Sequence, residues 1–174
     1  MQTALVINAG LGGLTLGIKQ AGSKVIAVYE KDTNAIKVHK QNFDIPIYTH
    51  ISQDNTVDCN NLDLLAAHIH IKTSSRIDTW ENQSDYDIIQ PLKLLKSYRP
   101  HKFLFFVNFS GFRKTIDFFL NEIIYIGYHY AYHIIDIGEA LGLPLKEKTI
   151  CIIGTRDNDN DQLFFPDFIH KNSQ

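Results

Sequence analysis

A glycine cluster that ends an apolar run near the N-terminus constrains the fold of this chain more than any other feature. The apolar residues Ala4–Asn8 are followed directly by Ala9–Gly13, which contains three glycines. An apolar run that stops at glycines predicts a buried parallel strand followed by a tight turn. We expect helices over Leu14–Ala21 and from Thr33 to about Asn42, on either side of a second strand over Lys24–Glu30. This order of elements is a βαβα unit.

The rest of the chain continues the alternation of strands and helices. Further strands are predicted at Asp63–Ala67, Lys102–Val107, Tyr128–Ile135 and Lys148–Gly154, and helices from Pro91 in a first turn to about Ser97 and over Thr115–Ile126, with a polar loop at Thr73–Ser84. Alternation at this spacing predicts a doubly wound α/β fold with a mostly parallel sheet. We expect one domain over residues 1–174.

Composition excludes several classes of protein. The 17 basic and 19 acidic residues give a net charge of −2, whereas free-standing DNA binders usually carry a basic excess. We therefore expect contact with DNA only through a partner. No apolar run reaches the roughly 20 residues that span a bilayer, so a cytoplasmic chain without a membrane partner is expected. The two cysteines are too few for a disulfide framework or a cysteine metal site, and no metal site is predicted.

The glycine cluster and an acid after the second strand predict a nucleoside-type site. Gly10, Gly12 and Gly13 precede a helix N-terminus, where backbone N–H groups can face a ligand. Glu30 ends the second strand, and a carboxylate there can accept hydrogen bonds from two ribose hydroxyls. The dinucleotide pattern needs a third glycine where Thr15 stands. A tight turn with a solvated Glu30 remains the alternative.

An ordered set of short segments resembles the DNA cytosine-5 methyltransferases. That family begins Asp-Leu-Phe-Ala-Gly-Ile-Gly-Gly and continues to Ala-Gly, a strand ending in Glu, and Asn-Phe. In register with it lie Ala9–Gly13, Gly17, Ala21-Gly22, Glu30 and Asn42-Phe43, followed by Asp63–Ala67, Arg99-Pro100, Asn108, Gly111, Gly127-Tyr128, Gly142–Pro144, Ile152–Arg156 and Phe165-Pro166. The resemblance extends to about residue 168.

The resemblance implies a Rossmann-like, S-adenosylmethionine-dependent methyltransferase fold. It assigns the site of the cofactor, S-adenosyl-L-methionine, to Ala9, Gly10, Leu11, Gly12, Gly13, Glu30, Lys31 and Ile51. An aromatic residue that the family places in the first loop is Asn8 here, the acid before it is Val6, and an acid expected near position 50 is His50. Weak or absent cofactor binding is therefore expected.

The residues that perform the family's chemistry are replaced. A cysteine thiolate must attack C6 of cytosine, but Ile71 stands at its position, between His70 and Lys72. An acid must hold the ring nitrogen, but Val107 aligns with that glutamate. A base-contacting arginine aligns near Thr149, and the Gln after Pro144 is Leu145. No catalytic residue is therefore assigned.

These replacements, with a target-recognition domain that is also expected to be absent, imply a chain that does not methylate DNA alone. It is expected to be one part of a split or restriction-modification methyltransferase, with a complementary methyltransferase subunit as partner. Two alternatives remain open. One is a nucleotide- or NAD-binding Rossmann protein whose resemblance is only architectural, and the other is an inert remnant.

Other conspicuous side chains receive structural interpretations. His68 and His70 share one face if their segment is a strand, but a metal site needs further ligands. Tyr128, Tyr130 and Tyr132 form one face of a strand and are interpreted as core residues, as are the phenylalanines Phe103, Phe105, Phe106, Phe109 and Phe112 and Cys151. Asp157–Asp161 lacks the glycine and glutamate of a calcium loop and is interpreted as a solvated turn.

Overall fold

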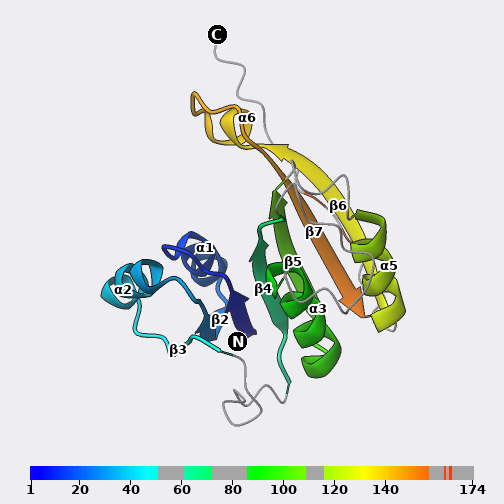
Figure 1. The fold of residues 1–174 in the computed structure, drawn as a ribbon, viewed down its shortest axis with the longest axis horizontal. Coiled ribbons are helices and arrows are strands. Elements are labelled where there is room, and N and C mark those ends of the chain that lie inside the picture. Colours follow the sequence, from blue (N-terminus) through cyan, green and yellow to red (C-terminus); the bar gives the residue numbers. More distant parts are fainter. Residues whose placement is uncertain (51–60, 72–85, 109–115, 157–162, 164, 166–174) are drawn as a thin grey trace.

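The computed structural model describes residues 1–50, 61–71, 86–108, 116–156, 163 and 165 (Figure 1). Along the chain the elements are β1 (Thr3–Ile7), α1 (Gly13–Gln20), β2 (Lys24–Tyr29), α2 (Thr33–Asn42), β3 (Ile47–Tyr48), β4 (Leu64–Ile69), α3 (Tyr86–Tyr98), β5 (Lys102–Asn108), α5 (Ile116–Ile126), β6 (Tyr128–Asp136), α6 (Ile137–Leu141) and β7 (Lys148–Arg156). The predicted loop at Thr73–Ser84 lies outside the described residues.

The described strands form one sheet in the order β3-β2-β1-β4-β5-β7-β6. All neighbouring pairs are parallel except those that involve β7, which is antiparallel to both β5 and β6. The expected doubly wound, mostly parallel sheet is therefore confirmed. The strand order reverses between β1 and β4, and ligands of such sheets bind at this point, beyond the carboxyl ends of the strands.

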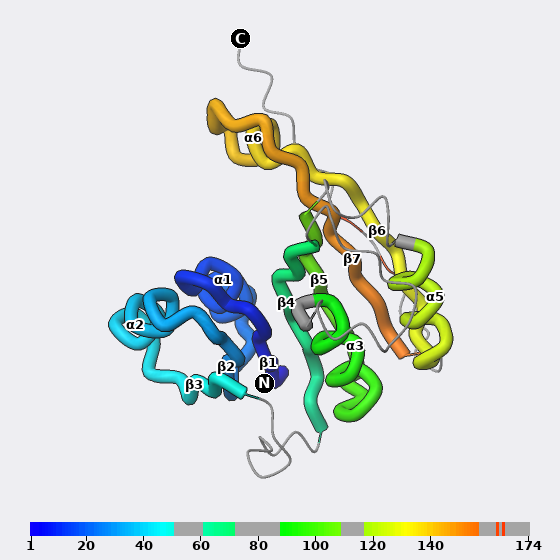
Figure 2. Tube along the Cα trace, in the orientation of Figure 1, coloured from blue at the N-terminus to red at the C-terminus, as the bar shows by residue number. Residues whose placement is uncertain are grey.

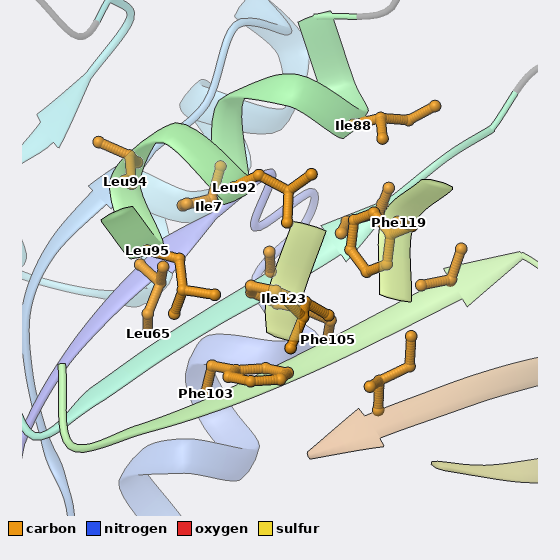
Figure 3. Packing of buried hydrophobic residues seen from close by; sticks show 14 of the residues in the cluster. Ile7, Leu65, Ile88, Leu92, Leu94, Leu95, Phe103, Phe105, Phe119 and Ile123 are labelled. Atoms are coloured by element: carbon orange, nitrogen blue, oxygen red, sulfur yellow. The ribbon is translucent and has the colours of Figure 1, made fainter. Parts of the chain in front are cut away.

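One face of the sheet carries the larger core, beneath α3 and α5. Leu92 and Leu95 of α3 and Ile123 of α5 pack against Leu65 of β4 and Phe105 of β5, and all five are buried (Figure 3). Each fully buried large apolar side chain in this layer contributes roughly 1.5–3 kcal/mol to stability. The layer also explains why β5, as a central strand, is apolar from Phe103 to Val107.

The opposite face is covered by α1 over only part of its width. Ile18 of α1 packs against Val6, Val28 and Ala66 of the neighbouring strands. Farther along this face, Leu104 is only partly buried. The tube trace shows α1 beside β1 and β2, while β6 and β7 carry α6 far away from α2 (Figure 2). The two faces of the sheet are therefore covered unequally.

Helix α3 corrects one prediction about its start. Pro91 was expected in a first helical turn, but α3 begins at Tyr86 and Pro91 lies inside it. A proline there removes one helical hydrogen bond and crowds the preceding turn. Ile88 and Ile89, both buried upstream of Pro91, gain enough by joining the core to extend the helix past it. Tertiary packing therefore overrides the local preference of proline.

Two sequence segments that resemble the family, Arg99-Pro100 and Gly127-Tyr128, contact each other in the folded chain. Tyr128, at the start of β6, is 1% exposed and donates a hydrogen bond from its hydroxyl to the carbonyl oxygen of Pro100 at 2.6 Å. The Arg99 guanidinium lies 5.6 Å from the Tyr128 ring and donates to the carbonyl oxygen of Ile126. Arg99-Pro100 and Gly127-Tyr128 therefore form one structural joint rather than part of a reaction centre.

Candidate functional site

The glycine turn after β1 has the backbone geometry of a cofactor loop. Gly10 and Gly12 have φ angles of 56° and 107°, in the left-handed region that favours glycine. A Cβ atom at Gly12 would lie 2.4 Å from the ring of Phe43, so any larger residue would displace that ring. The glycine turn therefore packs directly on Phe43 of the Asn42-Phe43 segment. The sequence alone does not predict this contact, because the two segments are about 30 residues apart.

Asn8 links the glycine turn to the ends of the two strands that flank β1. Its backbone has φ 53°, which asparagine tolerates better than most residues. Its backbone N–H donates to the carbonyl oxygen of Tyr29 at 2.8 Å, and its side-chain amide donates to that of His68 at 3.0 Å. Asn8 thus joins the ends of β1, β2 and β4. Sequence reasoning registered it only as a missing aromatic residue.

Glu30 is engaged by the protein's own backbone. Its carboxylate accepts N–H bonds from Gly10 at 2.7 Å, from Lys31 at 2.7 Å and from Asp32 at 3.0 Å, and the residue is 8% exposed. A carboxylate offers about four acceptor positions, so roughly one remains for a ligand. The predicted alternative of a solvated Glu30 is wrong, because the side chain is buried. Its main observed role is to pin the glycine turn to the end of β2.

The space beside Glu30 is small. A cavity of about 10 Å³ lies there, lined by residues that include Asn8, Glu30, Lys31, Thr49 and Gln90. This volume holds about one water molecule. A nucleoside is much larger than this cavity, so S-adenosyl-L-methionine would fit beside Glu30 only if these side chains moved. Ile51, which the sequence also assigned to this site, lies outside the described residues.

Thr15 joins α1 to α2 at the position where the dinucleotide pattern would need glycine. Thr15 and His39 are both fully buried, and the Thr15 hydroxyl and His39 Nε2 form a 3.0 Å hydrogen bond. The Nδ1 atom of His39 has no hydrogen-bond partner among the described residues. Burial lowers the pKa of His39 below its usual value, and the Glu30 carboxylate raises it by less. His39 was not singled out from the sequence.

The nucleophile position is occupied by a core residue. Ile71 is 1% exposed and belongs to the larger apolar core. Its backbone is held by the Asn108 side chain, whose Oδ1 accepts from Ile71 N–H at 2.6 Å and whose Nδ2 donates to Ile71 C=O at 2.9 Å. Val107, at the position of the family's glutamate, is fully buried as well. The two positions are brought near each other, but both present only hydrocarbon.

The remaining sequence candidates divide between core and surface. Cys151 is buried, and burial raises the pKa of its thiol to about 11, in line with the predicted packing role. Tyr128 is buried, but Tyr132, in the middle of β6, is 48% exposed, so the interpretation of one continuous core face is wrong there; β6 is an edge strand. Within the described residues no three side chains are grouped to hold a metal ion. Cys59, Phe109, Phe112 and Asp157–Asp161 lie outside them.

A larger hollow opens on the other side of the glycine turn. It measures about 770 Å³ and lies between α1, the open face of β4 and β5, and the base of α6. His68 and Glu147 line it; burial against this hollow and the neighbouring His70 lower the pKa of His68, and Glu147 raises it. Of the predicted cofactor site, Ala9 and Gly13 also line this hollow, whereas Leu11 and Lys31 are exposed outside it.

Comparison with known proteins gives consistent matches. Residues 5–174 match the profile of the C-5 cytosine-specific DNA methylases. The chain is 26% identical over 161 residues to the type II methyltransferase M.BsuFI of Bacillus subtilis, covering 87% of this chain and 39% of that protein. It is 25% identical over 165 residues to M.DsaV of Dactylococcopsis salina, covering 90% and 46%. The chain therefore spans less than half the length of these relatives.

Solved structures show the same fold. A Spodoptera frugiperda DNMT2 mutant superposes with a TM-score of 0.74 at 16% identity, over 96% of this chain and 54% of that one. The Dnmt2 methyltransferase of S. pombe gives 0.70 at 10% identity, over 93% and 51%. The expected methyltransferase fold is thus confirmed. Among the described helices, none has the length and apolar character needed to cross a membrane.

Proposed function

Because the chain belongs to the C-5 cytosine-specific DNA methylase family, we propose that it is a non-catalytic member that works with a complementary methyltransferase subunit. That subunit supplies the nucleophile, the acid and the contacts to DNA. The similarity of this chain to two type II methyltransferases supports a role in a restriction-modification system. The net charge of −2 supports contact with DNA through the partner rather than through this chain.

The observation that carries this proposal is the environment of residue 71. Methylation at C5 of cytosine begins when a thiolate attacks C6, because that attack makes C5 nucleophilic. Ile71 has no atom that can attack, and its side chain is packed in the core. Val107 likewise cannot donate to the ring nitrogen. Loss of a nucleophile abolishes a covalent route outright rather than slowing it slightly.

Methyl transfer from labelled S-adenosyl-L-methionine to DNA tests the proposal. We expect no incorporation by the pure chain, under conditions in which M.BsuFI, used as a positive control, labels the same DNA. Incorporation by the pure chain would contradict the proposal.

The variant Ile71→Cys separates chemistry from geometry. It restores the thiol, but we expect no activity, because a buried thiol has a raised pKa and is a poor nucleophile, as for Cys151. We also expect the new thiol to react with a maleimide far more slowly in the folded than in the denatured chain. Methylation by Ile71→Cys would show that position 71 can face the substrate.

The cofactor belongs to the same proposal. The family uses S-adenosyl-L-methionine in general, but the 10 Å³ cavity and the occupied Glu30 carboxylate support weak binding by this chain alone. A calorimetric titration should therefore show no binding at micromolar strength, about −8 kcal/mol. Micromolar binding would contradict the inferred weak binding and would leave the non-catalytic assignment in place.

A nucleotide- or NAD-binding protein with a merely architectural resemblance was the alternative that the sequence left open. The family match over residues 5–174 argues against it, because architecture alone does not produce a match to a sequence profile. Thr15 points the same way, since its buried hydroxyl contacts α2 where a dinucleotide-binding turn would carry glycine.

A further inference from the structure

The ring of His39 lies at a junction between α1, α2 and the glycine turn. It is fully buried, and its Nε2 atom forms a 3.0 Å hydrogen bond with the Thr15 hydroxyl of α1. Its ring centroid lies 4.6 Å from that of Phe43, just beyond the end of α2. A Cβ atom at Gly12 would lie 3.3 Å from His39 Cδ2 and 2.4 Å from Phe43 Cε2. The two rings therefore support the glycine turn from the α2 side (Figure 2).

The position of the His39 ring suits its neutral form only. A neutral imidazole carries one N–H, which Nε2 can donate to the Thr15 hydroxyl, and keeps a lone pair on Nδ1. A protonated imidazole carries a second N–H at Nδ1, and this atom is buried without a hydrogen-bond partner among the described residues. A buried, charged donor without an acceptor strongly destabilises the state that contains it.

The charged groups around His39 do not supply that acceptor. Glu30, after β2, attracts a protonated ring, but its carboxylate already accepts three backbone N–H bonds. On α1, Lys19 Nζ lies 5.4 Å from the Phe43 ring centroid and adds a positive charge. The glycine turn, residues 9–13, has no ionisable side chain. The other charged residues of the neighbouring segments are exposed: Lys31, Asp32, Lys37, Lys40 and Asp44.

We propose that His39 is a pH-sensitive switch of the glycine turn, which is closed while the ring is neutral and opens when the ring takes up a proton. The charged ring leaves its place between α1 and α2 to reach water. This movement breaks the bond to Thr15 and removes the ring on which Phe43 packs, so Gly12 loses its support. The larger core lies on the other face of the sheet and stays folded. The switch belongs to the free chain and does not depend on the proposed function.

Hydrogen exchange of the unsubstituted chain, followed by NMR, tests this switch. The Leu16 N–H donates to the carbonyl oxygen of Gly12 at 2.9 Å and reports on opening of the turn. After correction for intrinsic exchange, its opening constant should rise several-fold, and at most about tenfold, from about pH 7.5 to 5.5. The limit follows because opening binds one proton below the ordinary histidine pKa of about 6.5.

Urea distinguishes local opening of the turn from unfolding of the whole chain. The amide of Phe105, in the central strand β5, is the reference for global unfolding. Local opening exposes little surface, so low urea concentrations should leave exchange at Leu16 nearly unchanged while they accelerate exchange at Phe105. The His39 ring, titrated in the same samples, should gain its proton at lower pH than an exposed histidine, because burial lowers its pKa.

Three variants identify the group that takes up the proton. His39→Gln can still bond to the Thr15 hydroxyl but cannot titrate, so the pH dependence at Leu16 should fall below about twofold. His50→Gln, at an exposed histidine, is the matched control and should keep the full dependence. Thr15→Val keeps the side-chain shape but removes the hydroxyl, so exchange at Leu16 should be faster at every pH, with the dependence retained.

Four results would each overturn the switch. They are exchange at Leu16 that follows Phe105 in urea, exchange at Leu16 that does not change with pH, a His39 ring that titrates like an exposed histidine, and a pH dependence at Leu16 that survives in His39→Gln. The first three need only the unsubstituted chain, so they decide the question even if His39→Gln does not fold. Methylation by the pure chain would overturn the proposed function and leave the switch intact.

Discussion

Replacing Glu30 by glutamine tests whether this residue is a structural pin in the absence of any ligand. Glutamine keeps the shape of the side chain, but only one of its two terminal atoms can accept a hydrogen bond. If the oxygen faces Lys31 and Asp32, the amide nitrogen faces the N–H of Gly10, so two donors oppose each other. One charge-assisted bond is lost and a donor is left unsatisfied at a site that is 8% exposed.

The expected cost is about 2–3 kcal/mol of unfolding free energy, in the upper part of the range of about 1.5–3 kcal/mol for a hydrogen bond to a charged group, because a donor is also left unsatisfied. For a domain of this size it lowers Tm by about 4–12 °C. Differential scanning calorimetry without cofactor measures the change. Hydrogen exchange at the Gly10 amide gives a local readout, which should speed up in the variant because that amide loses its acceptor.

Glu139→Gln, on the exposed surface of α6, is the control and should stay within about 0.5 kcal/mol of the unsubstituted chain. Glu30 does not stabilise the glycine turn if Glu30→Gln also stays within about 0.5 kcal/mol and hydrogen exchange at the Gly10 amide is unchanged. In that case the carboxylate does not hold the glycine turn and would be available to a ribose.

Two further predictions concern polar groups near the site. Asn108→Ala removes both bonds to the Ile71 backbone and should cost about 2–3 kcal/mol in urea unfolding, whereas Asn42→Ala, which removes one exposed bond, should cost under about 1 kcal/mol. Equal losses would show that the two hydrogen bonds from Asn108 to the Ile71 backbone stabilise the fold no more than one exposed hydrogen bond does. Because burial lowers the pKa of His39 and His68, the unfolded chain binds more protons below about pH 6.5, so Tm should fall as pH drops from about 7.5 to 5.5. His39→Gln should flatten that slope in thermal melts at several pH values, and an unchanged slope would contradict the assignment.

Much of the fold could be predicted from short local patterns in the sequence. The apolar runs around Val6 and Phe105 and the glycines after β1 are local signals, and the strands and turn lie where they predict. The β3 strand (Ile47–Tyr48) and the α6 helix (Ile137–Leu141) were missed, because two and five residues are too few to set a period. The position of β7 between β5 and β6 depends on pairing over long separations, which no local pattern records.

The candidate site was harder to predict than the fold. The residue types at positions 71 and 107 were read from the sequence, but their burial was not. Asn108 contacts Ile71 across 37 residues, and Asn8 contacts His68 across 60, so both roles depend on the folded sheet. Glu30 was expected to face a ligand, whereas three backbone N–H groups reach it first.

The antiparallel insertion of β7 also sets the order in which the chain can complete its sheet during synthesis. β5 ends at Asn108 and β7 ends at Arg156, so 48 residues must be made after β5 before its second neighbour is complete. At about 5–20 residues per second, β5 waits roughly 2–10 s on the ribosome with one side unpaired. Its run Lys102–Asn108 is rich in phenylalanine, and an apolar open edge of that kind invites pairing with other nascent chains. Slow translation between residues 109 and 148 should therefore favour aggregation, and any truncation that removes β7 should make that open edge permanent.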